Sequence, residues 1–124
     1  MTDNELLELA AKAARIEGLT YRNGSDCFYY DDPDTGREEW NPLFDDGQAL
    51  RLVVKLSLPI EFRNAGFGYE KTPKNRRVMC GRFWDYRESR NSMFGERYGD
   101  DKQAATRRVI VRAAAEIGKS MGEN

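Results

Sequence analysis

The last quarter of the chain carries the most regular hydrophobic pattern. Apolar residues recur there every three or four positions, which is the spacing of one face of an α-helix. These residues are Ala105, Val109, Ile110, Ala113, Ala114, Ile117 and Met121. Asp100 or Asp101 is suited to cap the helix at its start. Arg112 precedes Glu116 by the four positions that favour an ion pair, so the pattern predicts an amphipathic helix.

The N-terminal segment shows a second helical pattern. Thr2 and Glu5 form a capping box, in which each side chain can accept a hydrogen bond from the backbone N–H of the other. Helically spaced apolar residues follow, namely Leu6, Leu9, Ala10 and Ala13. Gly18 is expected to stop this helix, because glycine readily adopts the left-handed conformation found at helix ends.

Two short stretches of strand-forming residues come next, "LTYR" and "CFYY", separated by "NGSD". Asn-Gly tolerates positive φ at both central positions of a tight turn, so these segments predict a β-hairpin. The following "DDPDTGREEW" is a polar turn that contains proline and glycine. It is expected to lead into a further strand or an irregular loop.

The segment "DDGQALRLVVKLSLPI" fits two structures. Its alternating apolar residues would suit a half-buried strand. In a helix, Gln48, Arg51 and Lys55 would instead form a narrow polar stripe, with every other face apolar. An aspartate before the apolar run can cap a helix, and Pro59 can end it. These signals favour a largely buried helix.

The remaining segment, residues 60–86, is predicted as β structure interrupted by the glycine-rich loop "NAGFGYEKTPKN". The full order is then helix, strands, helix, strands, helix. That order indicates an α+β fold, with an antiparallel sheet covered by helices as a sandwich. A chain of 124 residues fits a single domain, 1–124, whose core needs neither disulfides nor a metal.

Three of these segments together resemble a known family: "ELLELAAKAA", "WNPLFDDGQALRLVVKL" and "AATRRVIVRAAAEIG". They are similar to the phage ABA sandwich domain family, small proteins of bacteriophages and prophages that mostly lack an assigned activity. The resemblance implies a sheet-and-helix sandwich, a helix over residues 46–56, and a protein that works inside an infected bacterium. It provides no catalytic residues. A loop-and-strand insert at residues 63–98 is the part least like the family.

The composition excludes several kinds of chemistry. The chain has no histidine, which removes histidine-dependent triads, histidine general bases and the commonest nitrogen ligand of metals. Two cysteines, Cys27 and Cys80, are too few for a structural zinc site within one chain. No apolar run is long enough to span a bilayer, and the N-terminal segment does not resemble a secretory signal. The cysteines are therefore expected to stay reduced, in the cytoplasm.

Oxygen ligands for calcium or magnesium are present in two acidic groups. These groups are Asp31, Asp32 and Asp34, and Asp45 with Asp46. The first departs from a calcium-binding loop because Pro33 interrupts it. A hairpin turn and a helix cap account for these acids, so no metal or other cofactor is predicted. A metal-dependent phosphodiesterase that uses Asp31 or Asp45 is the least favoured alternative.

Charge is divided unevenly along the chain. Residues 1–50 contain twelve acids and four bases, whereas residues 71–90 contain seven bases and two acids. The stretch "NRRVMCGRFWDYRESR" mixes arginines with aromatic rings. Such a mixture suits a sheet strand whose arginines reach water, a protein-binding surface, or a site for a nucleotide or nucleic acid. The basic residues are also suited to neutralise the acidic half, within the domain or across a dimer.

The predicted binding residues come from this stretch and from the loop before it. They are Arg76, Arg77, Arg82, Trp84, Tyr86 and Arg87, with Lys71 and Lys74. In one unbroken strand, Val78 and Cys80 would share a face with Arg82, and Arg77 would lie on the opposite face. A bulge at Gly81 would exchange the later residues between the two faces.

The residues and the resemblance together predict a phage-encoded, non-enzymatic binding protein in the cytoplasm of the host bacterium. It is expected to inhibit or sequester a host component, such as part of an antiviral defence system. A host protein complex is the expected partner, with no membrane partner and with homo-oligomers left open. The alternatives are a sponge for a nucleotide signal and a nucleic-acid-binding accessory protein. The acidic first half is a second candidate for the working face.

Overall fold

The computed structural model describes residues 1–22, 24, 27–63, 76–85, 90–97 and 101–121, without the side chains of residues 63, 82–85 and 90–93. These ranges contain three helices and six strands. In chain order they are α1 (Asp3–Ala13), β1 (Thr20–Arg22), β2 (Cys27–Asp32), β3 (Gly36–Trp40), α2 (Asp46–Leu56), β4 (Ile60–Arg63), β5 (Arg77–Asp85), β6 (Arg90–Arg97) and α3 (Lys102–Met121). The predicted α+β class and the order of helices and strands are confirmed.

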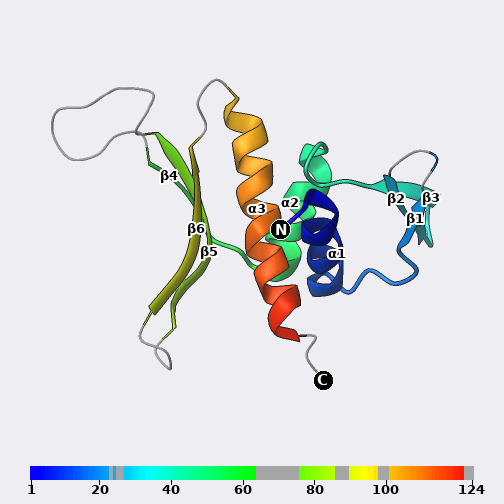
Figure 1. Ribbon diagram of the computed structural model, residues 1–124, viewed down its shortest axis with the longest axis horizontal. Coiled ribbons are helices and arrows are strands. Elements are labelled where there is room, and N and C mark those ends of the chain that lie inside the picture. Colours follow the sequence, from blue (N-terminus) through cyan, green and yellow to red (C-terminus); the bar gives the residue numbers. More distant parts are fainter. Residues whose placement is uncertain (23, 25–26, 64–75, 86–89, 98–100, 122–124) are drawn as a thin grey trace, which may run out of the picture.

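The strands form two antiparallel sheets of three strands each, in the orders β1-β2-β3 and β4-β5-β6. The predicted "NGSD" hairpin is confirmed by β1 and β2, and the next strand by β3, which follows the "DDPDTG" turn. All three helices lie between the two sheets (Figure 1). α3 covers one face of the β4-β5-β6 sheet, and α1 and α2 lie on the other side of α3. Each sheet is thus covered by helices on one face.

α3 is the central element, and its buried surface is wider than the predicted stripe. Val111 and Ala115 are buried in addition to most of the stripe, whereas Met121 at the end of the helix is exposed. The reason is that α3 packs against a sheet on one side and against two helices on the other. Its N-cap is Asp101, whose Oδ1 accepts a hydrogen bond from the Ala104 N–H at 2.9 Å.

α1 begins as predicted but ends earlier. The Glu5 N–H donates to Thr2 Oγ1 at 3.1 Å, which confirms the N-cap. The helix ends at Ala13, and Arg15 takes the left-handed conformation with φ of 56°. The Arg15 and Ile16 N–H groups then bond back to carbonyls of the last turn, as in a Schellman motif. The prediction that Gly18 stops the helix is therefore wrong.

The contact between α1 and α3 is made by small residues. The small buried residues are Ala10, Ala11 and Ala13 on α1, and Ala105, Ala113, Ala114, Ala115 and Gly118 on α3. Gly118 lies directly against the backbone of Leu9, so that a methyl group added at this position would overlap the Leu9 carbonyl. The absence of a side chain at Gly118 therefore sets how closely the two helices approach.

We expect Gly118→Ala to lower the free energy of unfolding by about 3 kcal/mol, because the added methyl meets a backbone carbonyl that cannot rotate away. Chemical denaturation followed by circular dichroism measures this loss. Gly24→Ala is the matched control, since nothing lies within 4 Å of its added methyl group. Equal stability of Gly118→Ala and the parent protein would contradict the close approach of the helices.

α2 is a helix, as the capping signals favoured. Asp45 Oδ1 accepts the Gln48 N–H at 2.9 Å, and Ser57 ends the helix in the left-handed conformation with φ of 53°. The predicted polar stripe is wrong at Gln48, which is buried. Its Oε1 accepts the Asn41 N–H at 2.6 Å, and its Nε2 donates to the Glu39 carbonyl at 2.5 Å. Gln48 thus attaches α2 to the end of the first sheet.

Replacing Gln48 with methionine should lower the free energy of unfolding by roughly 3 kcal/mol. Methionine preserves the shape of the side chain, but it leaves the Asn41 N–H and the Glu39 carbonyl without their partner in a buried place. Gln103→Met, at an exposed position of α3, should change the stability by less than about 0.5 kcal/mol. Urea denaturation of both variants separates the buried hydrogen bonds from a general effect of methionine.

The second sheet contains a strand that the sequence did not predict. β6 has the sequence "RNSMFGER", which lacks apolar alternation, and it forms by antiparallel pairing along β5. Its Gly95 stands opposite Met79, whose sulfur lies 2.7 Å from where a side chain at Gly95 would begin. The β5–β6 register shifts between Arg82 and Asp85. The irregularity therefore follows Gly81, the position where the sequence left a bulge open as an alternative to an unbroken strand.

Ion pairs connect α3 to the elements around it. Arg107 pairs with Asp46 at 2.7 Å, and Arg108 pairs with Asp3 at 3.1 Å. Arg112 Nη1 lies 3.0 Å from Glu96 Oε1 of β6, so the predicted pair between Arg112 and Glu116 is wrong. Two acids of the N-terminal half, Asp3 and Asp46, are thus neutralised by arginines of α3.

Candidate functional site

The predicted binding residues are only partly described by the structure. Arg76 immediately precedes β5, Arg77 begins it, and both are exposed. Arg82 and Trp84 belong to β5 by their backbone, and their side chains are outside the description. The other four lie outside the described residues: Lys71, Lys74, Tyr86 and Arg87. The described residues therefore show two arginines at the start of β5 and do not bring the predicted set together.

The start of β5 alternates between the two faces of the sheet as expected. Val78 and Cys80 are fully buried on the face toward α3, whereas Arg77 is exposed on the opposite face. The structure places no described helix or strand over that opposite face (Figure 1). This part of the basic stretch is thus a sheet strand with charged residues on its outer side.

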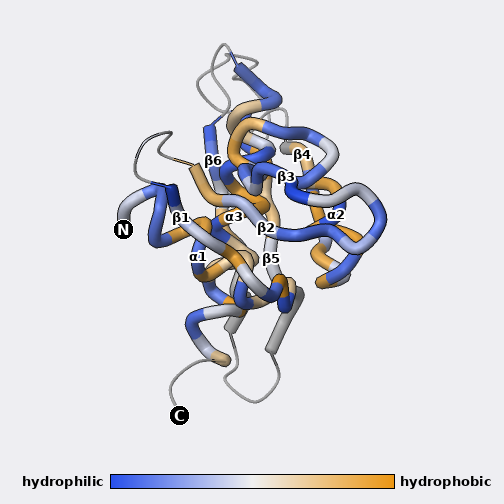
Figure 2. Tube along the Cα trace, turned by 90° about the vertical axis from the view of Figure 1, so that its right-hand side faces the viewer, coloured by the Kyte–Doolittle hydropathy of each residue, from blue (hydrophilic) through white to orange (hydrophobic). Residues whose placement is uncertain are grey.

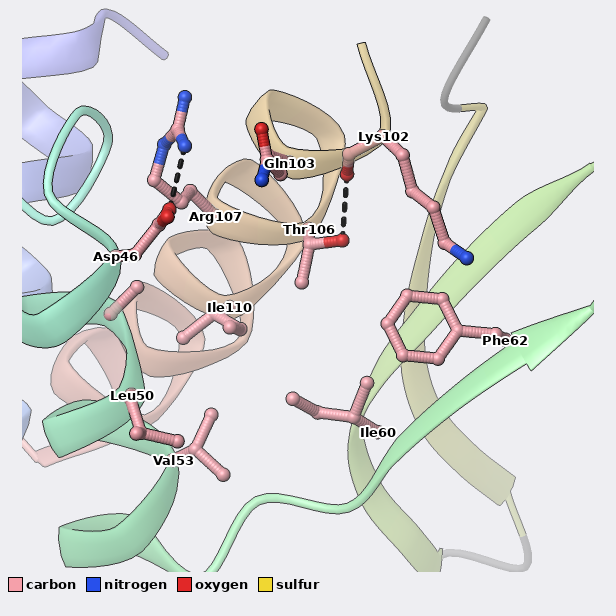
Figure 3. Close-up of a pocket in the computed structure, with 11 residues that line it drawn as sticks. Asp46, Leu50, Val53, Ile60, Phe62, Lys102, Gln103, Thr106, Arg107 and Ile110 are labelled. Carbon is pink, nitrogen blue, oxygen red and sulfur yellow. Dashed lines mark hydrogen bonds and ion pairs between the residues drawn. The ribbon is translucent and has the colours of Figure 1, made fainter.

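A groove between α2, α3 and β4 is lined almost entirely by apolar surface. It has a volume of about 380 Å³. Leu50 and Val53 approach from α2, Ile60 and Phe62 from β4, and Ile110 of α3 forms the floor (Figure 3). Nearly all of the lining is therefore hydrocarbon, which is the usual composition of a binding cleft.

Large apolar side chains around this groove reach solvent. Leu50 is 60% exposed and Phe62 is 45% exposed, and both line the groove. Val54 of α2 is 71% exposed but lies outside the lining. Figure 2 shows α2 at the side of the molecule, with hydrophobic residues along its length. Single exposed apolar residues are common, but a cluster that borders an apolar groove marks an interaction surface.

The charged part of the groove is held in place by α3. Arg107 Nη1 bonds to Asp46 at 2.7 Å, and its Nε donates to the Leu43 carbonyl at 2.8 Å. At the other end, the Lys102 ammonium lies 4.7 Å from the centre of the Phe62 ring, a cation–π distance. Asp46 and Arg107 pair with each other, and Lys102 is the second basic residue of the lining.

β4 is an edge strand of its sheet, and part of its backbone is directed outward. The Gly81 N–H donates to the Pro59 carbonyl at 3.3 Å, one position before β4 in the same register. Hydrogen-bonded and non-hydrogen-bonded pairs alternate along antiparallel strands. The backbone groups of Glu61 therefore bond to β5, whereas those of Ile60 and Phe62 point away from β5.

A second cavity, of about 330 Å³, lies on the other side of α2, against the first sheet. It is lined by side chains of both charges, among them Asp32, Glu38, Arg51 and Lys55. Tyr30 donates to Glu38 Oε2 at 2.9 Å, and burial together with this bond raises the Tyr30 pKa. Backbone N–H groups of the hairpin turn lower the pKa of Asp32. The acids here stabilise the turn and Tyr30, so this cavity selects no one kind of ligand.

Other chemistry in the described residues is limited. No three of their Cys, Asp and Glu side chains lie close enough to share a metal ion. None of the helices in the described ranges combines the length and hydropathy needed to cross a bilayer. Cys27 and Cys80 are not joined by a disulfide bond, and burial raises the pKa of the Cys80 thiol to about 11.

Cys80 should resist alkylation while the protein is folded. At pH 8 its raised pKa leaves about a hundredfold less thiolate than an ordinary cysteine has, and the side chain is fully buried. Iodoacetamide treatment followed by mass spectrometry should modify Cys80 only after denaturant is added. In the control variant Cys80→Ala, the modification that depends on denaturant should disappear. Rapid labelling of Cys80 in the native protein would contradict its burial.

No protein-family model, curated protein or solved structure matches the chain. The function must therefore be inferred from the residues of the chain itself.

The groove was missed by the sequence because its residues have the composition of a core. Leu50, Val53 and Val54 lie on a short helix with few polar residues, so the pattern favoured burial on every side. α2 in fact packs on one side only and leaves the excess apolar residues in solvent. The available signal was the number of apolar residues on this short helix, which exceeds the number that a single face can bury.

Proposed function

We propose that this chain is a non-enzymatic binding protein that captures another protein through the groove between α2, α3 and β4. The exposed apolar cluster around that groove is the observation that carries the proposal. Leu50 and Phe62 would lose their solvent contact on binding, and about 25 cal/mol is gained for each Å² of apolar surface that leaves water. Partly exposed aromatic and aliphatic residues in a preformed cleft are suited to serve as anchors for a partner.

The resemblance to phage ABA sandwich proteins suggests where the partner comes from. In that setting the partner is a component of the host bacterium, and binding inhibits or sequesters it in the host cytoplasm. A component of an antiviral defence system is one such target. The groove supports a protein partner over a nucleotide, because its lining is almost entirely apolar.

Affinity capture from bacterial lysate tests this proposal. We expect the tagged protein to enrich a host protein, and Leu50→Glu to reduce that enrichment at least about tenfold, since a carboxylate would be buried without a partner in an apolar interface. Val54→Glu is the matched control, because Val54 is equally apolar and exposed on α2 but does not line the groove. Circular dichroism checks that both variants keep the fold.

Two results would contradict this function. Equal capture by Leu50→Glu and the parent protein would remove the groove from the binding surface. Release of a nucleotide from the purified protein on denaturation, with no protein enriched above a tag-only control, would favour the nucleotide-sponge alternative. Quantitative mass spectrometry of the eluates for proteins and small molecules measures both.

A further inference from the structure

We propose that the partner binds as an extended strand that adds to the edge of β4 that no described strand covers and places alternate apolar side chains in the groove. This inference rests on the proposed function and specifies how the partner is bound. The chemistry of the partner is then an exposed, extended segment with apolar residues at every second position and an acidic residue nearby.

The backbone of β4 provides the first argument. The N–H and C=O groups of Ile60 and Phe62 point away from β5, as the Gly81–Pro59 hydrogen bond and the register require. Among the described elements β4 pairs with β5 alone. An added strand would supply partners for these groups, which is the way edge strands bind extended peptides.

The side chains of the same two residues provide the second argument. Ile60 and Phe62 both project into the groove, toward α2 (Figure 3). In a strand added beside β4, every second side chain would point to the same face as Ile60 and Phe62. Those side chains would fill the space between β4 and Leu50 of α2. The hydrogen bonds to the β4 backbone and the apolar contacts in the groove therefore place the bound segment at the same position.

Charge specifies the remaining part of the segment. Asp46 and Arg107 line one end of the groove and pair with each other, and the Lys102 ammonium lies at the other end, beside Phe62. A carboxylate in the bound segment would lie favourably near Lys102. The segment would therefore combine apolar residues at alternate positions with an aspartate or glutamate at one end.

Selection of short random peptides by display on the purified protein tests this inference without knowledge of the natural partner. We expect the selected peptides to share apolar residues at positions i and i+2 and an acidic residue. Their affinity should fall at least about tenfold with Leu50→Glu and stay within about twofold with Val54→Glu. Lys102→Gln should weaken only the peptides that carry the acid.

Amide hydrogen exchange measured by NMR provides the decisive comparison. When a selected peptide is bound, exchange at the N–H groups of Ile60 and Phe62 should slow at least about tenfold, because the added strand bonds to them. The Glu61 N–H already bonds to β5 and should change much less. Unchanged exchange at Ile60 and Phe62 would overturn strand addition.

The remaining outcomes separate this inference from the proposed function. Selected peptides with apolar residues at i, i+3 and i+4 would show that a helix binds, which overturns strand addition and leaves the groove as the binding surface. Dimers that are seen by light scattering and lost in Leu50→Glu would make a second copy of the chain the occupant, which also overturns it. If no peptide is selected, strand addition is rejected, while lysate capture with the same variants still decides the proposed function.

Discussion

The close approach of α1 and α3 at Gly118 is the constraint on which the rest of the structure depends. Because the Leu9 carbonyl lies where a side chain would start, the two helices touch through backbone and alanine methyl groups. α3 can then be buried on most of its circumference, with helices on one side and the β4-β5-β6 sheet on the other (Figure 1). The fully buried Val109 and Val111 show that little of this central helix is left for solvent.

The groove is a consequence of that arrangement. α2 and β4 both border α3, and the groove lies between them. Ile110 lies in the space between them and forms the floor, while Leu50 and Phe62 form the walls. The same packing that encloses α3 therefore holds two apolar surfaces apart, and Arg107, bonded to Asp46 and Leu43, fixes the distance at one end.

The sequence predicted local structure well and long-range arrangement poorly. The caps at Thr2 and Asp45 are short-range hydrogen bonds between residues three positions apart, so they could be recognised from spacing alone. β6 forms because it pairs with β5, and this pairing leaves no periodic signal in the sequence. The division of the strands into two sheets depends on the helices between them, and it leaves no such signal either. Leu50 was expected in the core because hydrophobicity alone does not show which apolar side chains are covered by another helix or strand. The basic stretch was predicted from composition, and the described residues do not test most of it.

Two helices end on residues other than glycine in the left-handed conformation, Arg15 after α1 and Ser57 after α2. In this conformation a residue with a side chain lowers the free energy of unfolding by roughly 1–2 kcal/mol. Glycine avoids that cost, and its greater conformational freedom in the unfolded chain offsets part of the gain. The sequence therefore leaves some stability unused at two surface turns, one far from the groove at Arg15 and one at Ser57, just before β4. The double variant Arg15→Gly/Ser57→Gly would have a higher free energy of unfolding. Destabilising charge substitutions around β4 could then be studied in a protein that remains folded.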